Sequence, residues 1–126
     1  MRAPQIYLAS TSPRRRDLLD QLGIRYRTLQ VEVDEMLCAN ELSDAYVMRL
    51  ARAKAWAGWQ ARDPQLACPA LGADTAVVLE GEVLGKPRDR AHGLEMLERL
   101  SGRNHQVLTA IAVVDGAREA MRLSVS

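Results

Sequence analysis

The sequence has few of the residues that several protein classes require. Aromatic residues make up 4% of the 126-residue chain and phenylalanine is absent, so the stacking platforms of single-strand nucleic-acid binders are scarce. The two cysteines, Cys38 and Cys68, lie far apart, which excludes a paired zinc-ligand spacing and favours free thiols in a reducing cytoplasm. A formal net charge of +1 gives no basic excess for coating nucleic acid.

Long hydrophobic runs are also missing from the sequence. No stretch is apolar over the length needed to cross a bilayer, and the N-terminus, MRAPQIYLAS, lacks the apolar length of a secretory signal. We therefore expect a cytoplasmic protein with neither a membrane nor a nucleic acid as its partner. The hydrophobic content of 48% is ordinary for a globular chain, and the length predicts one domain over residues 1–126.

The pattern of hydrophobic and turn residues predicts an α/β chain. Alternating or continuous apolar residues predict strands at 5–10, 25–33 and 70–79. Hairpin turns are expected at Glu80–Gly81 and Asp115–Gly116, each followed by a further strand. With helices between the strands, the predicted order is β-α-β-α-β-β-α-β-β, which is typical of an α/β fold.

Three helices are predicted from cap residues and from apolar residues at helical spacing. Ser12 is a suitable N-cap and Pro13 suits the first helical position. Either Ser43 or Asp44 caps the second helix, and Asp89 caps the third. We expect each helix to bury one apolar face. In chain order these faces consist of Leu18, Leu19 and Leu22; Val47, Leu50, Ala51, Lys54, Ala55 and Gly58; and Leu94, Leu97 and Leu100.

The turn after the first predicted strand, LASTSPRRRDLL, is electrostatically unusual. The arginines Arg14, Arg15 and Arg16 stand in the first turn of a helix, where the helix dipole favours anions. A solvated basic face is the ordinary interpretation of such a run. However, Ser10 and the two hydroxyl-bearing residues that follow it lie in the same turn as the unpaired N–H groups of the helix start. Because hydroxyl, N–H and guanidinium groups all donate to phosphate oxygens, this turn favours a phosphate-binding site that uses Arg14 and Arg15.

Four further charged residues are candidates for the same site. Lys54 lies on an apolar helix face, so its ammonium either reaches water along the surface or points at a phosphate. Asp74 interrupts an apolar strand, where an unpaired carboxylate is costly; it either caps a turn, binds a divalent cation or activates water. Glu35 follows a strand, and Lys86 stands in a stiff Gly-Lys-Pro turn. Together with the arginines, these residues suit a polyphosphate and its Mg²⁺.

The sequence resembles a known family over nearly its whole length. The motifs LASTSPRRRDLL, VDE, RLARAKA, LGADTAVV, GKP and MLERLSGRNHQVLTAIAV follow in the order found in the Maf family of nucleoside triphosphate pyrophosphatases. The resemblance implies a mixed β-sheet flanked by helices with a central cleft, similar to the inosine triphosphate pyrophosphatases. It also implies hydrolysis of dTTP or UTP to the monophosphate and pyrophosphate, a divalent cation (Mg²⁺ or Mn²⁺) as cofactor, and a homodimer.

The resemblance assigns roles to individual positions. Asp74 matches the catalytic base, Glu35 matches an acidic residue of the site, and both are expected to hold the metal. Arg14 and Thr75 match positions linked to substrate choice, and the GADT form resembles the branch that prefers dTTP and UTP. The positions that match phosphate-binding residues are Ser10, Arg14, Arg15, Lys54 and Lys86.

Family members normally continue past the point where this sequence stops, so we expect a C-terminally truncated form. The absent part usually supplies more sheet, a closing helix and a glutamine that contributes to substrate choice. Its absence is expected to expose sheet edges and to favour self-association. Two alternatives remain: a nucleotide-binding module with little catalysis and a regulatory role in cell division, and a basic helix that docks on nucleic acid.

Overall fold

The computed structural model describes residues 3–10, 12–84, 89–102 and 105–126. The elements in chain order are β1 (Ile6–Ala9), α1 (Pro13–Gln21), β2 (Tyr26–Thr28), α2 (Ser43–Gln60), β3 (Ala70–Leu79), β4 (Glu82–Leu84), α3 (Arg90–Leu100), β5 (His105–Val114) and β6 (Glu119–Val125). This order is the predicted one, and the α/β prediction is therefore confirmed.

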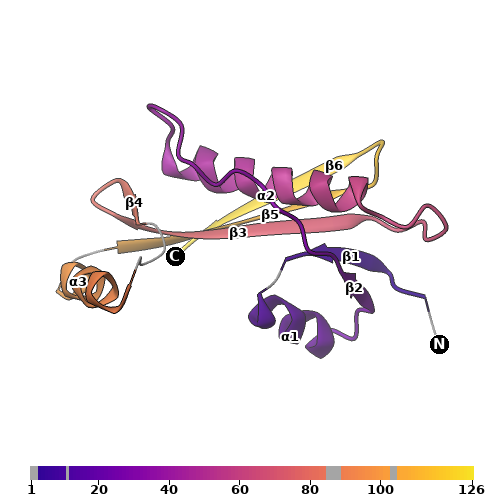
Figure 1. Ribbon diagram of the computed structural model, residues 1–126, viewed down its shortest axis with the longest axis horizontal. Coiled ribbons are helices and arrows are strands. Elements are labelled where there is room, and N and C mark those ends of the chain that lie inside the picture. Colours follow the sequence, from indigo (N-terminus) through magenta and orange to yellow (C-terminus); the bar gives the residue numbers. More distant parts are fainter. Residues whose placement is uncertain (1–2, 11, 85–88, 103–104) are drawn as a thin grey trace.

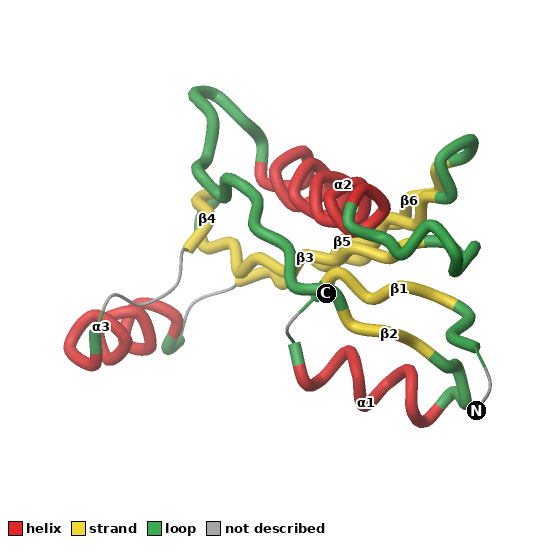
Figure 2. The backbone as a smooth tube through the Cα atoms, turned by 45° about the vertical axis from the view of Figure 1, so that its right-hand side comes forward, coloured by secondary structure: helices red, strands yellow, loops and turns green. Residues whose placement is uncertain are grey.

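The strands form one mixed sheet in the order β2-β1-β3-β5-β6, with β4 also paired to β3. β1 is parallel to both β2 and β3, whereas β3 is antiparallel to β4 and β5. The long strands β3 and β5 run through the middle of the sheet. Figures 1 and 2 show α2 along one side of it and α1 on the other side, next to β1 and β2.

One edge of β3 is only partly paired, and this determines where a site can form. On that edge β1 pairs with residues 70–72 and β4 pairs with residues 77–79, while β5 pairs along the whole opposite edge. Among the described strands none pairs with residues 73–76 on the β1 side. Asp74 and Thr75 lie in this gap, so a neighbouring strand does not cover them there.

The core lies between α2 and the sheet. As predicted, α2 has one buried face, made of Val47, Leu50, Ala51, Ala55 and Gly58. This face packs on alternate residues of the two central strands, Ala70, Ala76 and Val78 of β3 and Leu108, Ala110, Ala112 and Val114 of β5. Most of these side chains are small, which allows the helix to approach the sheet closely.

α2 approaches β3 closely at Gly72. A Cβ atom on Gly72 would lie 2.3 Å from the backbone nitrogen of Ala55 and 2.4 Å from the carbonyl oxygen of Ala51. A residue with a side chain therefore does not fit between helix and strand. Lys54 directly precedes Ala55, and Asp74 is on the same face of β3 as Gly72 because side chains alternate along a strand. The close approach thus brings Lys54 and Asp74 together.

The predicted caps of α1 and α3 and the first hairpin turn are observed. Ser12 is the N-cap of α1, with Pro13 following it. The carboxylate of Asp89, the N-cap of α3, accepts a hydrogen bond of 2.8 Å from the backbone N–H of His92. Both residues of Glu80–Gly81 have positive φ, as a tight turn between two antiparallel strands requires.

Two predicted boundaries are wrong. β2 ends at Thr28 instead of residue 33, because its partner β1 is itself only four residues long and the alternating residues beyond have no strand to pair with. The N-cap of α2 is Leu42, which makes no side-chain cap hydrogen bond; it is neither Ser43 nor Asp44. The carboxylate of Asp44 instead accepts a hydrogen bond from the next backbone N–H.

The apolar faces predicted for the other two helices are largely exposed. Leu19 is the buried residue of α1, whereas Leu18 and Leu22 are more than half exposed. No residue of α3 is buried, and Leu94 and Leu97 are also more than half exposed. Figure 1 shows the reason, since α3 lies beyond the β4 end of the sheet, away from α1 and α2. None of the helices described is long and apolar enough to span a membrane.

Candidate active site

A cavity of about 710 Å³ opens where β1 ends and the gap in β3 begins. Its walls come from the turn before α1, the segment after β2, helix α2 and strand β3. The predicted site residues that line it are Ser10, Arg15, Glu35, Lys54, Asp74 and Thr75. The volume lies within the range of about 300–1,000 Å³ that is usual for small-molecule sites.

Arg15 connects two walls of the cavity. Its guanidinium donates to the hydroxyl of Ser10 at 3.0 Å and to the hydroxyl of Thr75 at 3.2 Å. The same Ser10 oxygen accepts the backbone N–H of Ser12 at 3.2 Å. Burial lowers the pKa of Arg15, and the charge of Asp74 opposes this shift, but an arginine remains cationic at neutral pH. A positive charge and helix N-terminal donors therefore meet at one point, as binding of a phosphate requires.

Lys54 lies between two carboxylates. Its ammonium nitrogen is 3.0 Å from Oδ1 of Asp74 and 3.3 Å from Oε1 of Glu35. The side chains of Lys54 and Asp74 are only 18% and 12% exposed, whereas that of Glu35 is 45% exposed. The ammonium thus points into the cavity and not along the surface to bulk water. This ion pair also explains how an aspartate is accommodated in an apolar strand.

The carboxylates of Glu35 and Asp74 fit a divalent cation that arrives with a polyphosphate. Each carboxylate contacts the Lys54 ammonium through one oxygen, Oδ1 of Asp74 and Oε1 of Glu35, and a divalent cation would use the second oxygen of each. No group of three or more His, Cys, Asp or Glu side chains suitable for a metal occurs in the described part of the chain. Mg²⁺ is commonly bound by one or two carboxylates together with phosphate oxygens. The two carboxylates of the cavity agree with this mode of binding.

Among the predicted phosphate-binding residues, one does not line the cavity and one cannot be compared with it. Arg14 is exposed and is not among the residues that line the cavity, although it neighbours Arg15. Lys86 lies outside the described residues. The roles of both residues remain predictions.

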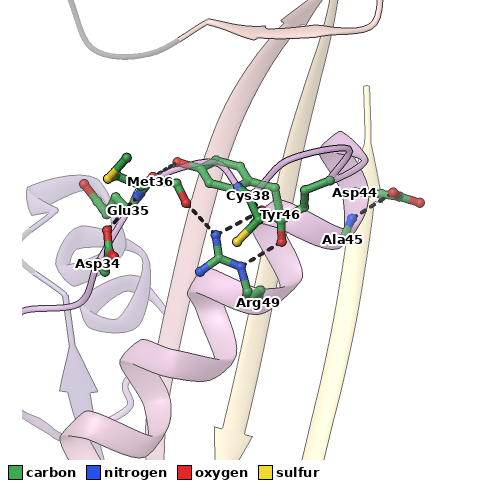
Figure 3. A network of polar contacts seen from close by, with 9 residues as sticks. Asp34, Glu35, Met36, Cys38, Asp44, Ala45, Tyr46 and Arg49 are labelled. Carbon is green, nitrogen blue, oxygen red and sulfur yellow. Dashed lines mark hydrogen bonds and ion pairs between the residues drawn. The ribbon is translucent and has the colours of Figure 1, made fainter.

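Sequence reasoning missed two residues of α2 that hold the loop carrying Glu35. The hydroxyl of Tyr46 donates to the backbone oxygen of Glu35 at 2.5 Å, and Arg49 contacts the same loop at the carbonyl of Met36 (Figure 3). Burial, together with the charges of Asp74 and Glu35, raises the pKa of Tyr46, so its phenol keeps the proton that it donates. Arg49 is the first residue of the RLARAKA motif, and this position in a family motif was the one sign in the sequence that it could contribute to the site.

Comparison with known proteins places the chain in a family. Residues 5–126 match the family described as Maf-like protein. The chain belongs to the Maf family. It is 55% identical over 126 residues to the dTTP/UTP pyrophosphatase of Alkalilimnicola ehrlichii, covering 98% of this chain and 62% of that protein. It is 54% identical over 111 residues to the dTTP/UTP pyrophosphatase of Pectobacterium atrosepticum, covering 88% and 55%.

The Maf chain thus spans about 55–62% of the length of these relatives. Two solved structures share its fold: protein VC0702 from Vibrio cholerae and the Ham1 protein of Staphylococcus aureus, both with a TM-score of 0.55. They cover 99% and 95% of this chain, which covers 64% and 68% of theirs, at 11% and 13% identity. These likenesses confirm the expected mixed α/β fold.

Proposed function

We propose that this Maf chain carries the catalytic centre of a nucleoside triphosphate pyrophosphatase that acts on dTTP or UTP. The convergence of Arg15, Lys54, Glu35 and Asp74 on one cavity of nucleotide size carries the proposal. Relatives named dTTP/UTP pyrophosphatase, at 50–55% identity, support the substrate class.

The triphosphate is bound by the cationic groups of the cavity. Arg15 and the hydroxyl of Ser10 donate to phosphate oxygens at the start of α1, and Lys54 neutralises a further phosphate from α2. Arg14 and Lys86 add positive charge in this proposal. Thr75 contributes to substrate choice through its position beside Arg15.

The reaction is the attack of water on the α-phosphorus. A bond forms between the water oxygen and this phosphorus, the bond to the oxygen that bridges to the β-phosphorus breaks, and pyrophosphate leaves. Asp74 accepts the proton from water, and Lys54 keeps its carboxylate oriented in the cavity. Mg²⁺ or Mn²⁺, when bound by Glu35 and Asp74, supplies charge neutralisation on the phosphate oxygens.

The proposal extends to the setting of the enzyme. A cytoplasmic location is supported by two cysteines that are free thiols. A homodimer is supported by the exposed leucines of α1 and α3, which offer apolar surface for association.

The test is a pyrophosphate-release assay on the purified chain with dTTP and UTP, in the presence of Mg²⁺, Mn²⁺ or EDTA. We expect metal-dependent formation of the monophosphate and pyrophosphate, and a loss of about 10²–10⁴ in rate for Asp74→Asn. Asp17→Asn, at an exposed position of α1, is the matched control and should keep the rate.

The dTTP/UTP pyrophosphatase of Alkalilimnicola ehrlichii serves as the positive control in the same assay. The proposal is wrong if the relative releases pyrophosphate and this chain releases none, or if Asp74→Asn retains full activity. Thermal stabilisation of the chain by dTTP without product would instead identify a nucleotide-binding module.

A further inference from the structure

Glu35 lies in a segment without helix or strand, between the end of β2 and the start of α2. Ladder hydrogen bonds do not fix the backbone there, and its side chain is half-exposed. Ordering such a segment costs conformational entropy, which only specific contacts can offset. The contacts of residues 35–41, called here the acidic loop, therefore decide whether Glu35 stays near Lys54.

Arg49 makes the most extensive contact with the acidic loop. Its guanidinium binds the Glu41 carboxylate in a two-pronged arrangement, with Nε to Oε2 at 2.7 Å and Nη2 to Oε1 at 3.0 Å. Nη2 also donates to the carbonyl of Met36 at 2.8 Å (Figure 3). Arg49 thus connects both ends of the loop to a single point on α2.

The partners of Arg49 are themselves fixed. The Oε1 atom of Glu41 also accepts the backbone N–H of Cys38 at 3.1 Å, and the backbone N–H of Glu41 donates to the carbonyl of Cys38 at 3.1 Å. The Glu41 side chain is 12% exposed. The guanidinium of Arg49 lies 5.6 Å from the ring centre of Tyr46, whose hydroxyl holds the backbone of Glu35.

We propose that Arg49 is a positioning residue that holds the acidic loop against α2 and thereby keeps the Glu35 carboxylate beside Lys54. This inference rests on the proposed function, because Glu35 matters only if the site binds a metal and a polyphosphate. Arg49 acts through the loop and does not line the cavity. Fixing Glu35 before binding lowers the entropy lost when the cation arrives.

The forked shape of the guanidinium is essential to this role. A lysine has the same charge but offers a single ammonium, which cannot bridge two carboxylate oxygens and a carbonyl with the same geometry. Arg49→Lys therefore separates the effect of geometry from that of charge. Arg52 offers a matched control on the same helix, because it pairs with Glu119 of β6 away from the cavity.

The first experiment measures backbone order parameters of the acidic loop by nuclear magnetic resonance in the free chain. We expect about 0.85 in wild type and Arg52→Met, and below about 0.6 in Arg49→Met, with Arg49→Lys between them. Equal values in Arg49→Met and Arg52→Met would overturn the proposal. If Arg49→Met does not fold, Glu41→Gln weakens the same contact from the loop side and is expected to raise loop mobility.

The second experiment titrates Mg²⁺ in the pyrophosphate-release assay. We expect the Mg²⁺ concentration at half-maximal rate to rise about 10–100-fold in Arg49→Met and to stay within twofold of wild type in Arg52→Met. A mobile loop with an unchanged Mg²⁺ midpoint would overturn the link between Arg49 and Glu35. If wild type releases no pyrophosphate, the proposed function fails, and the order parameters alone decide whether Arg49 holds the loop.

Discussion

Replacing Gly72 by alanine should both destabilise the fold and weaken the active site. The added Cβ would lie 2.3 Å from the backbone nitrogen of Ala55 and 2.4 Å from the carbonyl oxygen of Ala51. Contacts between non-bonded heavy atoms are favourable only near about 3.5 Å. Both neighbours are backbone atoms and cannot rotate away, so α2 has to move from β3 by about 1 Å to relieve the clash.

The expected loss in the free energy of unfolding is about 2 kcal/mol. Overpacking of a core costs roughly 1–3 kcal/mol, and the upper end applies here because a whole helix must shift. Replacing glycine also lowers the conformational entropy of the unfolded chain, which offsets about 0.4–1 kcal/mol of this loss. Because α2 carries Lys54, its shift also disturbs the 3.0 Å contact with Asp74, and a 1 Å displacement can cost about 100-fold in rate.

The assay is urea denaturation followed by circular dichroism, together with pyrophosphate release. Gly23→Ala is the control, because nothing lies within 4 Å of a Cβ at Gly23 and its φ is +71°. That variant should lose only about 1 kcal/mol through backbone strain and keep its activity. If Gly72→Ala is no less stable than Gly23→Ala, or keeps the wild-type rate, the spacing argument for the Lys54–Asp74 pair is refuted.

Three further predictions concern ionisable groups. Lys54→Met should lower the free energy of unfolding by about 2 kcal/mol in urea denaturation, because Asp74 is left unpaired in a mostly buried position. The hydrogen bonds from Arg49 lower the pKa of Glu41 in the folded state. The stabilisation that they give is therefore present above roughly pH 4.3, the usual pKa of an unfolded glutamate, and is lost as the pH falls through the lower pKa of the folded state. Glu41→Gln should accordingly flatten the decline in the free energy of unfolding at acidic pH. Burial raises the pKa of Cys68, so less of it is in the reactive thiolate form. Mass spectrometry should show that iodoacetamide modifies Cys68 more slowly than the exposed Cys38.

Several features of the fold could be predicted from local chemistry. The order of the elements, the cap at Asp89 and the turn at Glu80–Gly81 agree with the structure, because caps and turns depend on a few neighbouring residues. The extent of β2 could not be predicted in the same way. Its alternating pattern continues to residue 33, but a strand persists only where a partner strand runs beside it, and β1 is short.

The candidate site was predictable where a residue conflicts with its surroundings. Arginines at a helix start, and Asp74 in an apolar strand, point to a ligand or a partner because each is costly without one. Arg49 presents no such conflict, since an arginine on the polar side of a helix is ordinary. Its partner Glu41 is eight residues away in a segment without regular structure, and the pairing appears only in three dimensions.

The sequence by itself determined the kinds of element, their order and the chemical groups offered to a phosphate, because these follow from periodicity, capping and charge. The tertiary structure alone decided that β1 stops short and leaves a gap in β3, that Gly72 lets α2 approach, and that Lys54 lies between Glu35 and Asp74. These features depend on contacts between distant segments, whose geometry is set by packing that no local pattern encodes.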